Sequence, residues 1–195
     1  MTYWLGCDPG GEKKFGVAKL HPDGHFETRQ FSSVDEVLQL IDKEPLGVGI
    51  DSPLWWCSGE GGGRAADKWI RQSYGLSGGQ VQSVNSLRGA VVVQGILLAM
   101  KLREKYPNIR VTEAHPKAVL KALKIIENET LKRRFELFGE ISSEDERDAL
   151  IAAVAAREGF SGRWESDLAL NLSQLELDPK NLWYGRVNYW WPNTD

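Results

Sequence analysis

Three short apolar runs in this chain each end in an acidic residue, Asp8, Asp51 or Glu113. Apolar runs this short, bounded by Pro and Gly, are typical of buried strands in a parallel sheet. A carboxylate at the tip of such a strand is costly to desolvate unless a cation or hydrogen bonds compensate it. Because neighbouring parallel strands bring their carboxyl ends to one edge, the pattern predicts an α/β fold with an acidic edge.

The hydrophobic periodicity predicts five strands and a set of amphipathic helices. Turns containing Pro and Gly join the first three strands, which therefore form a meander, and a helix separates the third strand from the fourth. The predicted strands are residues 2–8, 15–20, 26–31, 46–51 and 110–113, and the predicted helices are residues 34–43, 64–74, 85–105, 129–138 and 144–158, with one more beginning at Pro116.

A chain of 195 residues is long enough for one domain with a sizeable core. We expect a single domain over residues 1–195, because no repeat or low-complexity linker divides it. Gly-rich sequence and a helix predict an insertion at about 54–84, and a Trp-rich C-terminal extension spans about 161–195. The aromatic residues at 183–191 predict a strand or hairpin that covers the sheet edge or pairs with a second copy in a homodimer.

The formal net charge of -3 argues against a protein that coats nucleic acid by bulk charge, but it leaves room for a local basic groove. The two cysteines are too few for a disulfide framework, so a reducing, cytoplasmic location is expected. The first residues lack a basic region followed by an apolar stretch, and no apolar run reaches the roughly 18 residues that span a bilayer. We therefore expect no signal peptide and no membrane partner.

Asp145 and Asp148 lie one helical turn apart on the last predicted helix, so their side chains share one side of it. Hydrolysis of a phosphodiester by two Mg²⁺ or Mn²⁺ ions, about 3.5–4 Å apart, needs three or four carboxylates from separate elements. Asp8, Asp51, Glu113 and Asp148 are the candidate catalytic and metal-binding residues, with Asp145 as an alternate ligand. Each residue alone is more often a turn or cap residue; the four together favour the metal site.

The motifs around these acids occur in a defined order. They are Gly6-Cys7-Asp8-Pro9-Gly10, Gly49-Ile50-Asp51-Ser52-Pro53-Leu54, Arg64-Ala65-Ala66-Asp67, Glu113-Ala114-His115-Pro116 and Asp145-Glu146-Arg147-Asp148-Ala149-Leu150. The set resembles the ribonuclease H-like superfamily and, more closely, domain-of-unknown-function family 429, described as predicted RNase H-like nucleases. The resemblance covers about residues 3–157 and implies an RNase H-like, five-stranded mixed sheet flanked by helices and a divalent-metal nuclease.

Several further residues near these motifs are candidate substrate contacts. Arg64, Lys68 and Arg71 recur at helical spacing, so they form either a phosphate-contacting face or an ordinary solvated one. Trp55 could stack a base or cap a small core, and His115 could ligate metal, move a proton or serve structure. Lys117, Lys121 and Lys124 show the same spacing as the first basic set, and there the solvated face is the favoured interpretation.

The predicted function is hydrolysis of phosphodiester bonds in DNA or RNA by a two-metal mechanism. One alternative is a nucleotide-binding phosphotransfer or ATPase-like domain, which shares an Asp-x-Gly turn after its first strand. Such proteins need two domains around the nucleotide, whereas this chain has one Asp-Pro-Gly turn, at Asp8. The other alternative is a non-catalytic scaffold or binding protein that keeps the fold. A metal titration separates the scaffold from the enzymes.

Overall fold

The computed structural model describes residues 2–194 and shows an α/β fold built on a mixed sheet. Within that range the main sheet has six strands in the order β3-β2-β1-β4-β5-β7. The first three strands are antiparallel neighbours, whereas β4, β5 and β7 run parallel to β1. The strands are β1 Trp4–Asp8, β2 Phe15–Leu20, β3 Phe26–Phe31, β4 Val48–Ile50, β5 Val111–Glu113 and β7 Val187–Asn188.

This topology confirms the predicted fold class and its antiparallel first three strands, and it is consistent with an RNase H-like arrangement. The five predicted strands are present, although 2–8 and 46–51 are shorter at their ends than expected. The sixth strand, β7, lies at the sheet edge within residues 183–191, where a strand or hairpin was expected, but the sequence pattern did not predict its bounds. It has two residues, which is too short for a detectable periodicity.

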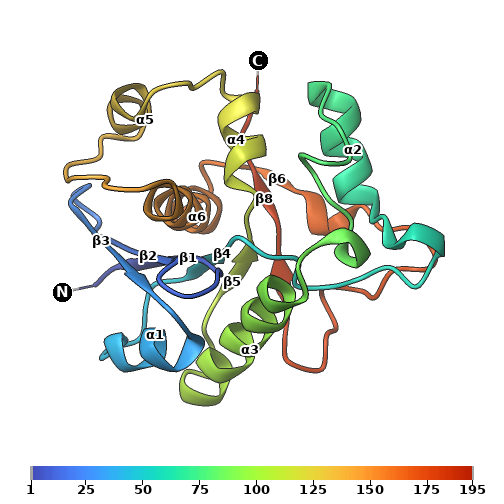
Figure 1. The fold of residues 1–195 in the computed structure, drawn as a ribbon, viewed down its shortest axis with the longest axis horizontal. Helices are drawn as coiled ribbons and strands as arrows, with labels where there is room; N and C mark the ends of the chain where they lie inside the picture. Colours follow the sequence, from blue (N-terminus) through green and yellow to red (C-terminus); the bar gives the residue numbers. More distant parts are fainter. Residues whose placement is uncertain (1, 195) are drawn as a thin grey trace.

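Helices cover both faces of the sheet (Figure 1). Helices α1 and α3 lie on one face, and α4, α5 and α6 lie on the other, while α2 lies beyond the end of the sheet. The helices are α1 Val34–Leu40, α2 Ala65–Tyr74, α3 Gly89–Lys105, α4 Pro116–Ala122, α5 Asn128–Phe135 and α6 Glu144–Phe160, with 3₁₀ turns η1 Glu60–Gly62, η2 Val84–Ser86 and η3 Leu168–Leu170. Among residues 2–194, none of these helices has the length and apolar character that crossing a membrane requires.

Helix α6 packs so closely on the sheet that only glycine fits beneath it. A Cβ atom added to Gly6 would lie 1.9 Å from the backbone oxygen of Ala149, and one added to Gly49 would lie 1.9 Å from that of Ala152. The small Ala side chains of α6 allow this approach, which removes the helix and both central strands from water. Ser143 caps the helix by accepting a hydrogen bond from the Glu146 backbone N–H.

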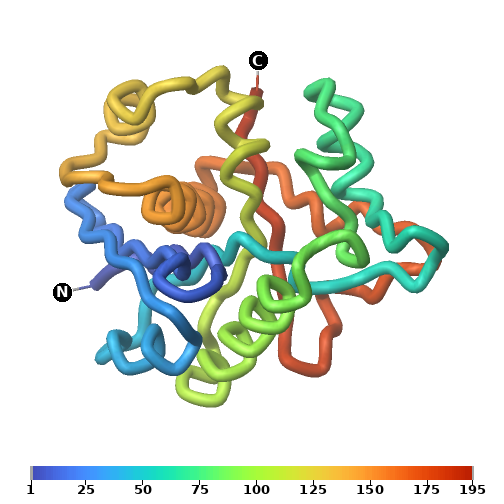
Figure 2. The backbone as a smooth tube through the Cα atoms, viewed as in Figure 1, coloured from blue at the N-terminus to red at the C-terminus, as the bar shows by residue number. Residues whose placement is uncertain are grey.

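The C-terminal segment confirms strands within residues 183–191 but not the hairpin that was the other expected alternative. The two C-terminal strands do not pair with each other. Strand β7, Val187–Asn188, pairs with β5. Strand β8, Trp190–Trp191, pairs with β6, Ser166–Asp167. The Asp167 carboxylate fixes this corner by accepting hydrogen bonds from the Asn188 side chain and the Tyr189 backbone. The tube in Figure 2 shows the insertion at 54–84 lying beside this segment, and Leu177 donates its backbone hydrogen bond to Trp56.

Candidate metal centre

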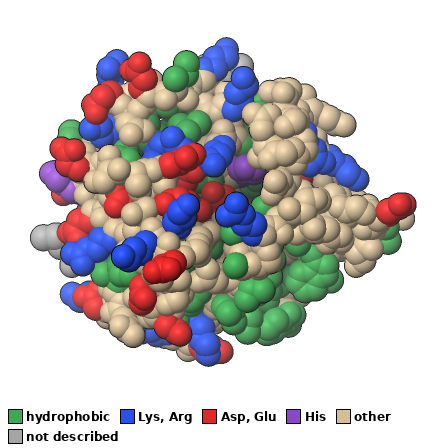
Figure 3. Space-filling model, viewed as in Figure 1, with side chains coloured by type: hydrophobic (Ala, Val, Ile, Leu, Met, Phe, Trp, Pro, Cys, Tyr) green, Lys and Arg blue, Asp and Glu red, His purple; other side chains and the backbone are tan. Residues whose placement is uncertain are grey.

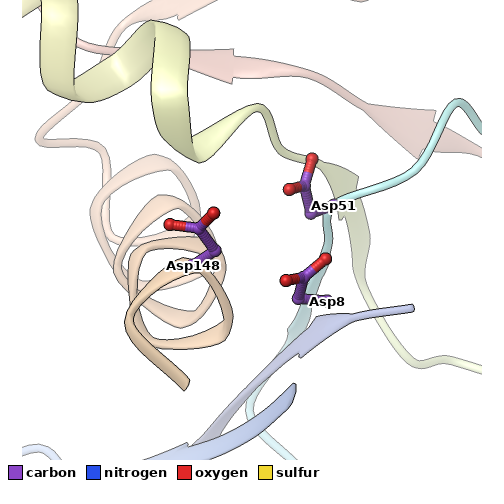
Figure 4. Close-up of side chains that lie close together, drawn as sticks. All are labelled: Asp8, Asp51 and Asp148. Carbon is purple, nitrogen blue, oxygen red and sulfur yellow. The ribbon is translucent and has the colours of Figure 1, made fainter. Parts of the chain in front are cut away.

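Asp8, Asp51 and Asp148 converge at the carboxyl edge of the central strands (Figure 4). Asp8 ends β1, and Asp51 directly follows β4, the parallel neighbour of β1. Asp148 comes from the second turn of α6, which the glycine contacts hold against both strands. One ligand oxygen from each carboxylate lies within 4.8 Å of the others, so the three could share one cation.

The electrostatics of this cluster favour a bound cation. Burial, with the charges of Asp148 and Asp145, raises the pKa of Asp8 to about 8. Burial together with the charge of Asp8 raises the pKa of Asp51 well above its usual value. Burial also raises the pKa of Asp148, although its hydrogen bonds to Arg147 oppose the shift. Three carboxylates this close repel one another, and an oxygen-only donor set of this kind suits Mg²⁺, Mn²⁺ or Ca²⁺.

Arg147 and Gln30 determine which acidic oxygens are free. Arg147 donates from Nε and Nη2 to a single oxygen of Asp148, Oδ1, at 2.9 and 2.7 Å, which leaves Oδ2 for a ligand. Asp145, the predicted alternate ligand, is outside the cluster, and its Oδ2 accepts a hydrogen bond from Gln30 Nε2 at 2.8 Å. Its charge still acts on Asp8, so it contributes to the negative field of the site.

Glu113 lies outside the cluster, although it ends a neighbouring strand as expected. The register pairs Cys7 with Ile50 and Ile50 with Glu113, so Asp8 and Asp51 are each one residue further along. Because side chains alternate between the faces of a sheet, Glu113 points away from the side that Asp8 and Asp51 share. Its two oxygens instead accept hydrogen bonds from Arg64, at 2.6 and 2.7 Å, and from the Leu54 backbone at 3.0 Å.

Arg64 and Trp55 are each only 1% exposed. This corrects the exposed helix face predicted for Arg64, whereas Trp55 agrees with the alternative that it packs in the core. Arg64 is the residue before α2, where it also pairs with Asp67, and its guanidinium lies 4.2 Å from the Trp55 ring centroid. Burial would lower the pKa of Arg64, but Glu113 and Asp67 outweigh it and hold that pKa well above its usual value. Both side chains therefore belong to the buried packing that joins the insertion to β5 and the C-terminal segment.

The remaining predicted contacts have different environments. Lys68 is exposed, whereas Arg71 is half-buried and donates to the backbone oxygen of Val81 at 2.8 Å. His115 immediately precedes α4, and burial lowers its pKa to about 4, so its ring is neutral near pH 7. Within residues 2–194, its Nδ1 atom is buried and has no hydrogen-bond partner.

Lys117 is exposed, in agreement with the solvated face that was favoured for it, but it also lies near the acidic cluster. It lies in the first turn of α4, its Nζ is 3.1 Å from Glu144, and its charge acts on Asp8, Asp51 and Asp148. Figure 3 shows acidic side chains gathered near the middle of this face with Lys and Arg side chains around them. A helix that follows a parallel strand begins at the carboxyl edge of the sheet. Because Lys117 lies in the first turn of such a helix, this rule could have placed it near the acidic cluster.

A surface cavity of about 700 Å³ lies elsewhere, between the turn at 22–24 and α5. Its lining includes Asp23, Glu129 and Glu136 together with Lys132 and Arg133. Acidic and basic side chains both line this cavity, so its charge does not indicate one class of ligand. Asp8, Asp51 and Asp148 are not among its lining residues. The acidic cluster of the central strands remains the candidate functional site.

A family model described as "Protein of unknown function (DUF429)" matches residues 6–171. This range includes the whole acidic cluster, Lys117 and the Arg64–Glu113 pair, but it stops before β7 and β8. No curated protein and no solved structure matches the chain.

Proposed function

We propose that this chain, which belongs to the DUF429 family, is a divalent-metal-dependent phosphodiesterase that acts on nucleic acid. The observation that carries the proposal is the convergence of Asp8, Asp51 and Asp148 within 4.8 Å. These three residues would hold Mg²⁺ or Mn²⁺. A cation bound there would supply positive charge at a phosphoryl oxygen and would lower the pKa of a water.

Hydrogen bonds and strand register hold the three carboxylates in position for this reaction. Arg147 fixes one oxygen of Asp148, and the parallel register of β1 and β4 aligns Asp8 with Asp51. In hydrolysis, the water oxygen bonds to phosphorus, the P–O ester bond breaks, and the departing oxygen takes a proton. A centre preorganised by buried hydrogen bonds loses little free energy to rearrangement when charge develops on the phosphoryl group.

Nucleic acid is the proposed substrate because cationic side chains occur near the acidic cluster and an exposed aromatic residue follows Asp51 in the chain. Lys117 is exposed beside the cluster, and Arg147 lies next to Asp148. Trp56, which follows the buried Trp55, is 39% exposed and offers a ring on which a base could stack. The net charge of -3 predicts modest, salt-sensitive affinity, because few phosphates would be neutralised.

The test is cleavage of labelled single-stranded, duplex, hybrid and branched oligonucleotides with Mg²⁺ or Mn²⁺, with ATP hydrolysis as a separate arm. We expect metal-dependent cleavage by the wild type and loss of at least about 100-fold in Asp8→Asn. The matched control is Asp35→Asn, which changes an exposed carboxylate on α1. Absence of both cleavage and a metal-induced rise in melting temperature would exclude the proposal, and hydrolysis of ATP alone would favour the phosphotransfer alternative.

A further inference from the structure

The three clustered carboxylates of this centre are the smallest number with which two divalent cations could be held. A pair of divalent ions is normally held by carboxylates that both bridge and flank them. Glu113, the expected fourth ligand, has both oxygens committed to Arg64 and Leu54. Asp145 is held by Gln30 outside the cluster. The described residues therefore offer one three-carboxylate set, whose ligand oxygens lie within 4.8 Å of one another and so suit a single cation position.

Lys117 lies where a second positive charge would act. Helix α4 begins three residues after β5 ends, at the same carboxyl edge as Asp51 (Figure 4). The only ion pair of Lys117 among residues 2–194 is with Glu144, at 3.1 Å, and both side chains are more than 60% exposed. An exposed pair of this kind contributes roughly 0–1 kcal/mol, so a phosphate could replace Glu144 with little loss.

We propose that the centre binds a single divalent cation and that the Lys117 ammonium contacts the substrate phosphate as the second positive charge. This inference rests on the proposed phosphodiesterase function and refines it. A lysine suits the task because its ammonium is a compact charge with three donors on a flexible stem. Asp8, Asp51 and Asp148 would set the position of the cation, and Lys117 would reach a phosphoryl oxygen from α4.

The first experiment counts cations in the wild-type protein by calorimetric titration with Mn²⁺ and by electron paramagnetic resonance of the bound ion. We expect one Mn²⁺ per chain and an electron paramagnetic resonance spectrum that shows no magnetic coupling between two Mn²⁺ ions. Two Mn²⁺ per chain with magnetic coupling would overturn this inference while leaving the phosphodiesterase proposal intact. No bound Mn²⁺ at all would overturn the phosphodiesterase proposal and this inference with it, so the two failures are distinguishable.

The second experiment compares Lys117→Met, Lys117→Arg and the control Lys121→Met, an exposed residue in the last turn of the same helix. We expect Lys117→Met to bind Mn²⁺ at least as tightly as the wild type, because a positive charge near the carboxylates has been removed. Its cleavage of bis(4-nitrophenyl) phosphate should fall about 100-fold, with partial recovery in Lys117→Arg. Lys121→Met should behave as the wild type.

A readout that does not depend on turnover completes the test. Inorganic phosphate is titrated into each Mn²⁺-loaded variant, and we expect at least tenfold weaker binding for Lys117→Met than for the wild type. Equal phosphate affinity in the two proteins would overturn the proposal. Parallel loss of Mn²⁺ binding and melting temperature would also overturn it, because that pattern would assign Lys117 a structural role.

Discussion

Arg64 donates from both terminal nitrogens to the two carboxylate oxygens of Glu113, at 2.6 and 2.7 Å, and both side chains are buried. Glu113 ends a central strand, whereas Arg64 belongs to the insertion that follows Asp51. The same Glu113 carboxylate accepts the Leu54 backbone N–H, three residues after Asp51. The ion pair therefore ties the chain that follows Asp51 in the acidic cluster to the neighbouring strand β5.

We predict that Arg64→Met destabilises the protein strongly, because it leaves the Glu113 and Asp67 carboxylates buried without their partner. Removing one member of a buried ion pair typically costs about 3–5 kcal/mol. Urea unfolding gives the free energy of unfolding, and the matched control is the double variant Arg64→Met with Glu113→Gln. The double variant should lose less than the single one; equal losses would mean that the pair is not coupled.

The clustered carboxylates predict that the stability of the metal-free protein falls as pH rises. Folding raises the pKa of Asp8 to about 8, and it also raises those of Asp51 and Asp148. Between the unfolded pKa near 4 and the folded values, the native state binds more protons than the unfolded state, so raising the pH favours unfolding. We expect the free energy of unfolding in EDTA to fall by at least about 1 kcal/mol between pH 5 and pH 8.

Two comparisons check the cause of this pH dependence. The drop should shrink in Asp8→Asn, which removes one of the three groups with a raised pKa, and it should be suppressed by saturating Mn²⁺. Asp35→Asn, on an exposed turn of α1, should keep the drop of the wild type. A metal-free protein that is equally stable at both pH values would contradict the electrostatic picture of the site.

The acidic strand tips made much of the fold and part of the site predictable. A short apolar run followed by Asp and Pro or Ser indicates where a buried strand ends, and Asp8 and Asp51 lie at such ends in adjacent strands. Asp148 could be expected at the site because its helix carries small residues on the side that meets the sheet. The structure brings these three carboxylates together.

The parts that could not be predicted depend on register and long-range pairing. Glu113 pairs with Ile50, the residue before Asp51. An offset of one residue in the register of two strands places a side chain on the opposite face of the sheet. Arg64 has the spacing of a surface helix residue, but its burial follows from a partner 49 positions away. The two-residue strands of the C-terminal segment carry no periodicity, so their pairing with β5 and β6 could not be expected.

Glu176 gives a third prediction, because it fastens the C-terminal segment to the insertion. Its carboxylate accepts hydrogen bonds from Trp55 Nε1 at 3.0 Å and from the Ala65 backbone at 2.6 Å. We expect Glu176→Ala to lower the free energy of unfolding by about 1–3 kcal/mol, because three partly buried donors, the Ser173 backbone N–H included, lose their acceptor. Limited proteolysis should also cleave the variant faster at 56–64. Glu165→Ala, an exposed control, should change neither property.

The fourth prediction concerns the contact that places Asp148 beside Asp51. A methyl group at Gly49 would lie 1.9 Å from the backbone oxygen of Ala152, so Gly49→Ala must push α6 away from β4. We expect a loss of more than about 3 kcal/mol in the free energy of unfolding, since backbone cannot move aside as a flexible side chain can. The fraction of Gly49→Ala protein that still folds should bind Mn²⁺ at least tenfold more weakly than the wild type, because Asp148 is displaced.

Gly11→Ala is the matched control for this substitution. Gly11 lies in the loop after Asp8, and an added Cβ atom there meets nothing within 4 Å. Its free energy of unfolding and its Mn²⁺ affinity should both stay close to those of the wild type. If Gly49→Ala instead matched Gly11→Ala in stability, the close approach of α6 to the sheet would not be what holds the three carboxylates together. If it lost stability but kept full Mn²⁺ affinity, the position of Asp148 would not be what determines metal binding.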